Sequence, residues 1–270
     1  MNTGNRNQKS EVKTAVIYIT DNGLKLAESL KGLYPDVRTE KFSAGAVHEL
    51  WSEHKNLIFI MAAGIVVRTV APLVKDKKTD PAVVVLDEKG RFAISLLSGH
   101  LGGANRLAGE IAGFLGGEAV ITTASDINGM TSIDIWARDN NLAIDNWNLL
   151  PAVSSKLLNN ASLDVYSEAD LQLPPDFSAA VDADAADILI TNKSNIYSKR
   201  KGQFIMRPRN IVVGFGCNSG TQAEEIEDAV NRIFDENNLS FSALHSIATL
   251  DKKGKEPGLI AFAGKHNINV

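Results

Sequence analysis

Three apolar segments between residues 57 and 126 each end in a turn rich in glycine or threonine, and this arrangement constrains the fold more than any other feature of the chain. The turns read AAGIVVR (62–68), SGHLGGANR (98–106) and TTASD (122–126). Glycine lets backbone N–H groups approach a ligand closely, and the first two turns lead into helix-like sequence, whose N-terminus is partially positive. The pattern therefore predicts strand, turn and helix in alternation, with a site for an anionic group at the turns.

The alternation predicts an α/β fold with a mostly parallel sheet in the N-terminal part of the chain. The segment LIFIM (57–61) is apolar throughout, as expected of a parallel strand that helices cover on both faces. Two further apolar segments, 83–86 and 92–97, flank DEKG (87–90), which is typical of a hairpin turn. We therefore expect one hairpin within an otherwise parallel sheet.

A chain of 270 residues is long enough for about two domains, and three small ones are possible. The changes in composition along the chain favour three α/β domains. We expect an N-terminal anion-binding domain over 1–128, a small middle domain over 129–208, and an incomplete C-terminal domain over 209–270. The second boundary rests on the basic and polar stretch 192–209, in which Pro208 precedes the next strand.

The overall charge argues against a nucleic-acid partner. Lys and Arg number 28 against 32 Asp and Glu, so the chain has no global positive field to attract nucleic acid or anionic lipid. Any anion site must therefore be local.

Three features predict a cytoplasmic protein with no membrane partner. The single Cys217 cannot form an internal disulfide and suits a reducing compartment. The opening residues 1–13 are polar, unlike a signal peptide. The longest apolar run, 57–67, ends at Arg68 and is too short to cross a bilayer.

The strongest local signal is the expected strand-to-helix junction SGHLGGAN, because it combines consecutive glycines, an imidazole and an amide. Backbone N–H groups of Gly102 and Gly103 could hold a carboxylate or a developing oxyanion, and His100 could transfer a proton near neutral pH. In the alternative interpretation, the histidine only satisfies backbone groups of a turn. The candidate functional residues here are Ser98, Gly99, His100, Gly102, Gly103 and Asn105.

The first turn offers a candidate carboxylate-binding arginine. Arg68 follows Gly64 by four residues, so its guanidinium would lie within one turn of the helix N-terminus if the helix begins at the glycine. A guanidinium binds carboxylates in bidentate fashion, which favours substrate binding. The alternative is a solvated helix arginine.

The third turn supplies hydroxyls and a carboxylate. Thr122, Thr123 and Asp126 follow a strand that we expect to end at the same sheet edge as the other turns, where open α/β sheets bind ligands. The hydroxyls could bind carboxylates, and Asp126 could orient His100 or act as a base. Equally, Asp126 could serve only as a helix cap.

A further glycine turn, GFGCNSGT (214–221), differs by one residue from the dinucleotide-binding fingerprint, which disfavours a nicotinamide site, although the turn could still bind an anion. Thr221 and Glu224 have capping-box spacing before the next helix.

Cys217 has no nearby histidine, and the histidines lack metal-ligand spacing, so we predict no metal held by the protein. These histidines are His48, His54, His100, His245 and His266.

Two stretches of the chain resemble a known family. Residues 61–108 (MAAGIVVR to GGANRLA), followed by VITTASD, resemble the N-terminal domain of the cobalt-precorrin-5A hydrolase family of anaerobic cobalamin biosynthesis. Residues 212–230, followed by 247–263, resemble the start of the C-terminal domain of that family. The resemblance implies a variable middle domain between them. It also implies that more of the C-terminal domain follows Val270, so that this chain is truncated.

The resemblance further implies the substrate and the reaction. The substrate would be a contracted tetrapyrrole that carries its own cobalt, so no cofactor is expected, and other enzymes of cobalamin biosynthesis are candidate partners. Hydrolysis would open a δ-lactone and release acetaldehyde. In this chemistry His100 would act as acid and base with Asp126 as its partner or substitute, while Arg68 and Asn105 would position carboxylates of the substrate.

Two other classes of function stay open from the sequence. The first is a non-catalytic module that binds or channels corrinoids, because the C-terminal type of domain also occurs as a separate protein. The second is an enzyme acting on nucleotides or sugar phosphates through the same anion-binding turns.

Overall fold

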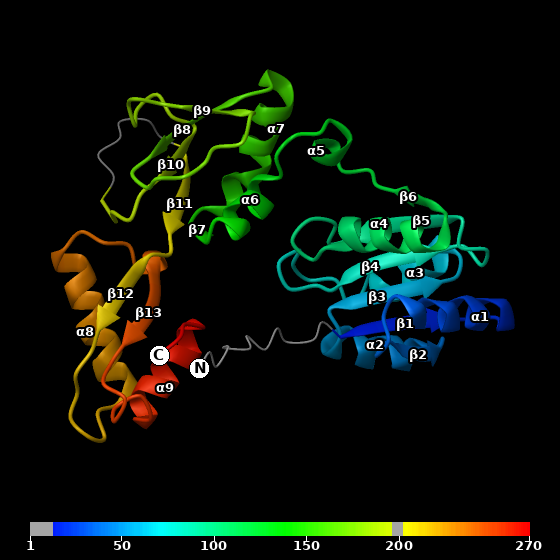
Figure 1. Cartoon of the computed structure of the whole chain (residues 1–270), viewed down its shortest axis with the longest axis horizontal. Helices are drawn as coiled ribbons and strands as arrows, with labels where there is room; N and C mark the ends of the chain where they lie inside the picture. Colours follow the sequence, from blue (N-terminus) through cyan, green and yellow to red (C-terminus); the bar gives the residue numbers. More distant parts are fainter. Residues whose placement is uncertain (1–12, 196–201) are drawn as a thin grey trace, which may run out of the picture. The chain divides into compact units, whose positions relative to one another are not determined.

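The computed structural model describes residues 13–195 and 202–270. The chain divides into two compact units, with the division between Ile127 and Asn128 (Figure 1). The prediction that the polar residues 1–13 are not a signal peptide falls almost wholly outside the described residues. Part of the basic stretch 192–209, on which the second domain boundary rests, also falls outside them.

The first unit contains a six-stranded sheet in the order β2-β1-β3-β4-β5-β6. The four strands β1 to β4 are parallel, β5 is antiparallel to β4, and β6 is parallel to β5. The predicted α/β class, with a mostly parallel sheet and one hairpin, is confirmed. The strands are β1 (Thr14–Tyr18), β2 (Arg38–Lys41), β3 (Asn56–Ile60), β4 (Ala82–Leu86), β5 (Phe92–Leu97) and β6 (Glu118–Val120).

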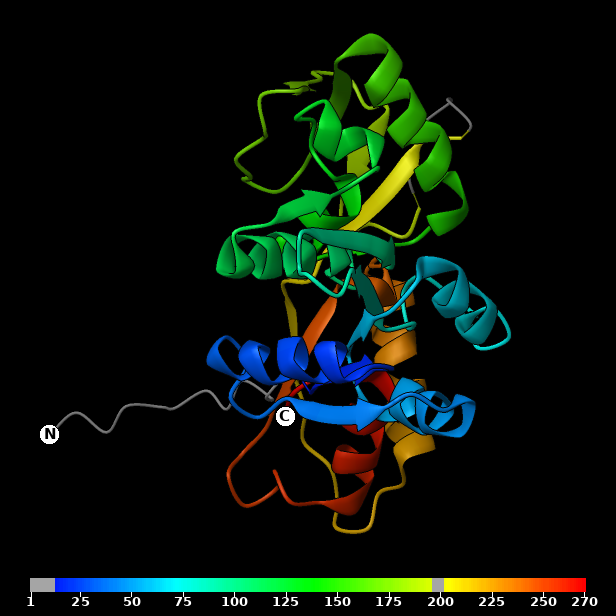
Figure 2. The same ribbon diagram turned by 90° about the vertical axis from the view of Figure 1, so that its right-hand side faces the viewer.

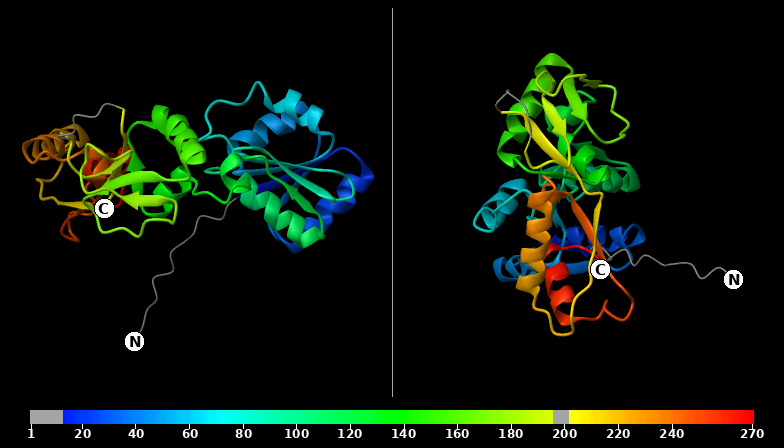
Figure 3. Two further views of the ribbon diagram at one scale, coloured as in Figure 1. Left: turned by 90° about the horizontal axis from the view of Figure 1, so that it is seen from above. Right: turned by 90° about the vertical axis from the view of Figure 1, so that its left-hand side faces the viewer.

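Helices cover both faces of this sheet (Figures 2 and 3). Residues of α1 and α4 pack on one face, and residues of α2 and α3 pack on the other. Every residue of β3 and β4 is buried as a result, which explains why these strands show no polar alternation. The helices are α1 (Asp21–Ser29), the 3-10 turn η1 (Leu30–Gly32), α2 (Ala44–Glu53), α3 (Ala63–Val70), α4 (Ala104–Leu115) and α5 (Ala124–Ile127).

The β4–β5 hairpin reverses the direction of the chain within the sheet. Leu86 pairs with Ala93, and Val83 near the start of β4 pairs with Leu97 at the end of β5. The carboxyl ends of β5 and β6 therefore lie at one edge of the sheet, and the carboxyl ends of β1 to β4 lie at the opposite edge.

The second unit contains a five-stranded sheet in the order β7-β11-β10-β8-β9 and a separate parallel pair, β12-β13. Each sheet has its own cluster of buried apolar side chains. The strands are β7 (Leu142–Ile144), β8 (Leu163–Ser167), β9 (Phe177–Ala179), β10 (Ile188–Ile190), β11 (Phe204–Pro208), β12 (Ile211–Gly214) and β13 (Leu244–Ala248). The helices are α6 (Ile133–Asp139), η2 (Trp147–Leu149), α7 (Leu150–Asn160), α8 (Ala223–Glu236), η3 (Phe241–Ala243) and α9 (Pro257–His266).

Across the described residues, no helix combines the length and the apolar character needed to cross a membrane.

Candidate functional site

A histidine and an aspartate meet at the edge of the first sheet where β5 and β6 end. His100 Nε2 lies 2.8 Å from Asp126 Oδ2, and Ser125 Oγ lies 3.2 Å from the same ring nitrogen. Because β5 and β6 are parallel neighbours, the turn after β5 and the short helix α5 after β6 adjoin, which brings together residues 26 positions apart. The side chains are 21% and 38% exposed, so the pair can reach a ligand.

Asn105 lies behind this pair, in the first turn of α4. Its side chain is buried, with the residue only 8% exposed. Its Nδ2 donates to Asp126 Oδ2 at 3.0 Å and to Thr123 Oγ1 at 3.2 Å, while its Oδ1 accepts from Ser95 Oγ at 2.6 Å. Both amide hydrogens are therefore given to protein acceptors, and none is left for the contact with substrate carboxylates that the sequence suggested.

The turn between β5 and α4 is tightly packed, and its glycines make room for other groups. A Cβ atom on Gly99 would lie 2.7 Å from Asn105 Oδ1, and one on Gly102 would lie 2.4 Å from Ser98 Cβ. Ser98 and Gly103 have φ values of 56° and 89°, and the Ser98 hydroxyl oxygen is buried without a hydrogen-bond partner. Close packing thus accounts for Gly99 and Gly102, and the left-handed backbone accounts for Gly103.

The two glycine N–H groups expected to bind an oxyanion differ in their availability. The Gly103 N–H donates to the His100 carbonyl at 2.9 Å, within the turn itself. In the described part of the chain the Gly102 N–H donates to no protein acceptor. Of the two, Gly102 is the donor that a ligand can use.

Gly64 and Arg68 lie at the opposite edge of the sheet, so the prediction of a single shared edge is wrong for them. The Arg68 guanidinium does fold over the first turn of α3, since its Nη1 lies 3.6 Å from the position of a Cβ on Gly64. However, α3 begins where β3 ends, whereas the His100 turn begins where β5 ends. The antiparallel β4–β5 pairing separates the two turns.

Thr122 and Thr123 follow β6 and lie on the same side of the sheet as His100. Thr123 accepts a hydrogen bond from Asn105, and Thr122 is exposed.

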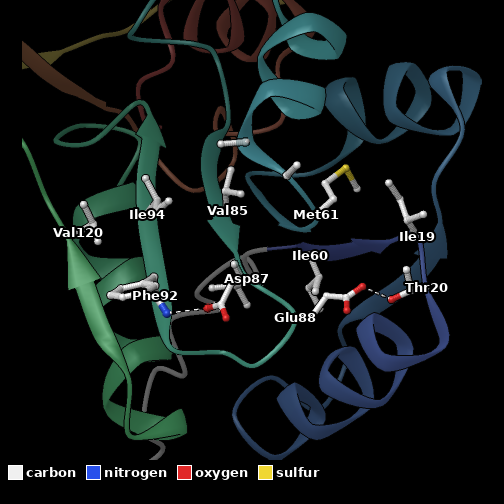
Figure 4. A pocket seen from close by; sticks show the side chains of 13 residues that line it. Ile19, Thr20, Ile60, Met61, Val85, Asp87, Glu88, Phe92, Ile94 and Val120 are labelled. Atoms are coloured by element: carbon white, nitrogen blue, oxygen red, sulfur yellow. Dashed lines mark hydrogen bonds between the residues drawn. The ribbon is translucent and has the colours of Figure 1, made fainter.

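A cavity of about 470 Å³ opens at the carboxyl edge of β1, β3 and β4, and the sequence interpretation did not anticipate it (Figure 4). The apolar ends of these buried strands could have predicted it, because open α/β sheets bind ligands at the edge where their parallel strands end. Its lining is mainly apolar, from Ile19, Ile60, Met61, Val85, Phe92, Ile94 and Val120, with Thr20, Asp87 and Glu88 as polar members.

The polar groups of this cavity serve local structure. Thr20 Oγ1 accepts from the Gly23 N–H at 3.1 Å to cap α1, and its hydroxyl donates to Glu88. Asp87 accepts from the backbone N–H groups of Phe92 at 2.8 Å and Lys89 at 3.2 Å. Although partial burial raises the pKa of Asp87, these hydrogen bonds outweigh it and lower the pKa below its usual value. With two carboxylates in its lining, the cavity suits an apolar group better than an anion.

The glycine turn of the second unit already holds a carboxylate of the protein. Glu256 accepts from Ser219 Oγ at 3.0 Å and from the Gly220 N–H at 3.2 Å, and it pairs with Lys253 Nζ at 2.8 Å. Lys253 first, and then the Gly220 N–H and the Ser219 hydroxyl, lower the pKa of Glu256. The sequence suggested that this turn could bind an anion, and the Glu256 carboxylate of the chain itself already accepts two of its hydrogen bonds.

Within residues 13–195 and 202–270, no three His, Cys, Asp or Glu side chains come together so as to hold a metal ion.

A sheet covered by helices on both faces, with a partly exposed histidine–aspartate pair at a glycine turn, defines the class of this unit as an α/β protein with a candidate acid–base site. Residues 45–126, which include that pair, match the family model described as Cobalamin synthesis G N-terminal, and residues 211–270 match the model described as Cobalamin synthesis G C-terminus. The chain belongs to the cobalamin synthesis G family, which confirms the resemblance seen in the sequence.

Relatives with assigned names span most of the chain. A protein from Priestia megaterium named cobalt-precorrin-5A hydrolase is 30% identical over 93% of this chain and 77% of its own length. A protein of the same name from Salmonella typhimurium is 32% identical over 92% and 78%, respectively. A solved structure of a putative cobalamin biosynthesis protein G homolog from Sulfolobus solfataricus aligns over 95% of this chain and 78% of its own, with a TM-score of 0.46 and 22% identity.

Proposed function

We propose that this protein is a hydrolase that opens the δ-lactone of cobalt-precorrin-5A and releases acetaldehyde to give cobalt-precorrin-5B. Its named relatives support the substrate and the reaction. The single observation that supports a catalytic role for this chain is the partly exposed contact between His100 and Asp126, at 2.8 Å, within the segment matched to the family.

His100 would move the proton in the lactone-opening step. The imidazole removes a proton from water as the water oxygen bonds to the lactone carbonyl carbon. The resulting imidazolium returns this proton to the ring oxygen as the lactone C–O bond breaks, which leaves a carboxylic acid and an alcohol. Asp126 stabilises the imidazolium through its carboxylate, and the Gly102 N–H donates to the oxyanion that forms on the carbonyl oxygen.

Release of acetaldehyde would follow at the new alcohol. A base removes the hydroxyl proton, the C–O bond becomes the aldehyde carbonyl, and the bond from that carbon to the macrocycle breaks. The electron pair of the broken bond remains on the macrocycle, which then takes up the proton from the protonated base. The same histidine, again neutral after the first step, can serve as this base.

The remaining predicted residues divide between the two edges of the sheet. We place Ser98, Gly99, Gly103, Thr122 and Thr123 with His100, as the walls of the site that faces the lactone. Gly64 and Arg68 form a separate contact for a peripheral carboxylate. A five-residue strand such as β3 spans about 16 Å, so one small group of the substrate cannot touch both edges.

The test separates an enzyme from a non-catalytic corrinoid-binding module. The protein is incubated with cobalt-precorrin-5A, and acetaldehyde and the corrinoid product are measured over time. We expect one acetaldehyde for each substrate consumed, over many turnovers. Binding of the corrinoid without release of acetaldehyde would favour the non-catalytic module and overturn the proposal.

A further inference from the structure

We propose that Asn105 is a positioning residue that holds the Asp126 carboxylate against His100, rather than a residue that binds substrate. This inference rests on the proposed function for the part that concerns catalysis. Its structural part, the dependence of the histidine–aspartate contact on Asn105, can be tested without any turnover.

The hydrogen bonds of Asn105 fix which way its amide points. The Ser95 hydroxyl donates to Oδ1 at 2.6 Å, which places the oxygen of the amide on the side of Ser95. The NH₂ group then faces two acceptors, Thr123 Oγ1 and Asp126 Oδ2. The opposite orientation would set the amide oxygen against a carboxylate oxygen, where both groups can only accept.

Asp126 needs such an anchor because its own element is short. It belongs to α5, which has only four residues, and its side chain is 38% exposed. Its hydrogen bonds among the described residues come from the side chains of His100 and Asn105, and both end on Oδ2. Asn105, by contrast, is buried in the twelve-residue helix α4 and is tied to the sheet through Ser95. A buried side chain of the longer helix therefore anchors the partly exposed carboxylate.

Both the backbone and the side chain of Asn105 contact the turn at Gly99. The Asn105 N–H donates to the Gly99 carbonyl at 3.0 Å, and a Cβ on Gly99 would collide with Asn105 Oδ1. The same residue thus closes the strand-to-helix turn with its backbone and supports the acid–base pair with its side chain.

The first experiment compares Asn105→Leu, which keeps the approximate volume and removes the amide, with the wild-type protein. We expect kcat to fall at least about tenfold, as for loss of a hydrogen bond to a charged group, while KM stays within about twofold. Asn159→Leu, on an exposed position of α7, is the matched control and should leave both unchanged. A rise in KM with kcat retained would assign Asn105 to substrate binding and overturn the inference.

The second measurement needs no substrate. The ring-nitrogen NMR signals of His100 report its contact with Asp126, and we expect them to move in Asn105→Leu and to stay in place in Asn159→Leu. Unmoved signals would contradict the positioning role even if the protein is inactive, whereas moved signals in an inactive protein would count only against the proposed function.

A milder variant keeps the inference testable if Asn105→Leu does not fold. Ser95→Ala leaves Asn105 in place and removes the donor that orients its amide. We expect a smaller loss of kcat, roughly two- to tenfold, at constant KM, together with a shift of the His100 signals. Unchanged kcat and unchanged signals in this variant would overturn the inference.

Discussion

At the scale of single residues, the candidate site is a contact between His100 and Asp126 to which the buried amide of Asn105 donates a hydrogen bond. His100 and Asp126 were predictable because a histidine in a glycine turn and an acid after the next strand are typical of acid–base sites. The role of Asn105 was not predictable, because the sequence does not show that Ser95, ten positions earlier, faces the same amide. The sequence suggested anion binding as the reason for the glycines, and the structure adds a second reason, because a Cβ on Gly99 or Gly102 would collide with neighbouring atoms.

Replacement of Gly99 by alanine tests this packing explanation. The new methyl group would lie 2.7 Å from Asn105 Oδ1, so we expect Gly99→Ala to lower the free energy of unfolding by about 1–3 kcal/mol and to reduce turnover with it. Gly113→Ala in the following helix α4 is the control, because a Cβ there meets no atom within 4 Å and alanine favours a helix, so stability should rise by about 0.5–1 kcal/mol. Urea denaturation measures both variants, and equal effects at the two glycines would contradict the explanation.

At the scale of secondary-structure elements, the apolar segments and the DEKG turn were sufficient to predict the α/β class and the hairpin. The consequence of the hairpin was missed: it reverses β5 and β6, so turns that look equivalent in sequence leave opposite edges of the sheet. The capping box predicted at Thr221 was also wrong. Helix α8 begins after Gln222, and the Thr221 hydroxyl donates instead to the Asn218 carbonyl at 3.0 Å within a loop that Glu256 binds.

The stability of the β4–β5 hairpin, which separates the two edges of the sheet, should depend on pH through the ionisation of Asp87. The pKa of Asp87 is lower in the folded protein than its usual value of about 3.9, so its stabilising effect is present at neutral pH and is lost as the pH falls below about 4. We expect Asp87→Ala to lower the free energy of unfolding by about 1 kcal/mol at pH 7, and the difference from wild type to shrink toward pH 3.

Urea denaturation of both proteins at several pH values measures this difference. Asp36→Ala is the control, because Asp36 is exposed and accepts no hydrogen bond among the described residues, so its effect should stay within about 0.5 kcal/mol. A difference for Asp87→Ala that does not change between pH 7 and pH 3 would show that its carboxylate does not stabilise the turn.

At the scale of the whole molecule, the chain combines a first unit that has one six-stranded sheet with a second unit that has two sheets. The first unit has helices on both faces of its sheet and two apolar clusters of its own. The proposed division of the remainder into a middle and a C-terminal domain stays a prediction. Two observations point in opposite directions. Each of the two sheets has a small apolar core of its own, which favours two domains. Hydrogen bonds nevertheless join the segments near residues 193 and 239, which favours a single unit.

The first unit should therefore fold without the second. We expect a fragment that ends at Ile127 to show the circular dichroism of an α/β protein and a single cooperative transition in urea. The His100 ring signals in this fragment should match those of the full chain if the acid–base pair is complete within the unit. A fragment without a cooperative transition would show that the N-terminal sheet depends on the rest of the chain.

The proton transfer assigned to His100 is the central claim, and release of acetaldehyde from cobalt-precorrin-5A by His100→Ala tests it most directly. General acid–base catalysis contributes about 10² to 10⁴ in rate, so this variant should release acetaldehyde at least about 100-fold more slowly than the wild-type protein. His48→Ala, at an exposed position of α2, should retain the wild-type rate. Undiminished release by a folded His100→Ala protein would contradict the account.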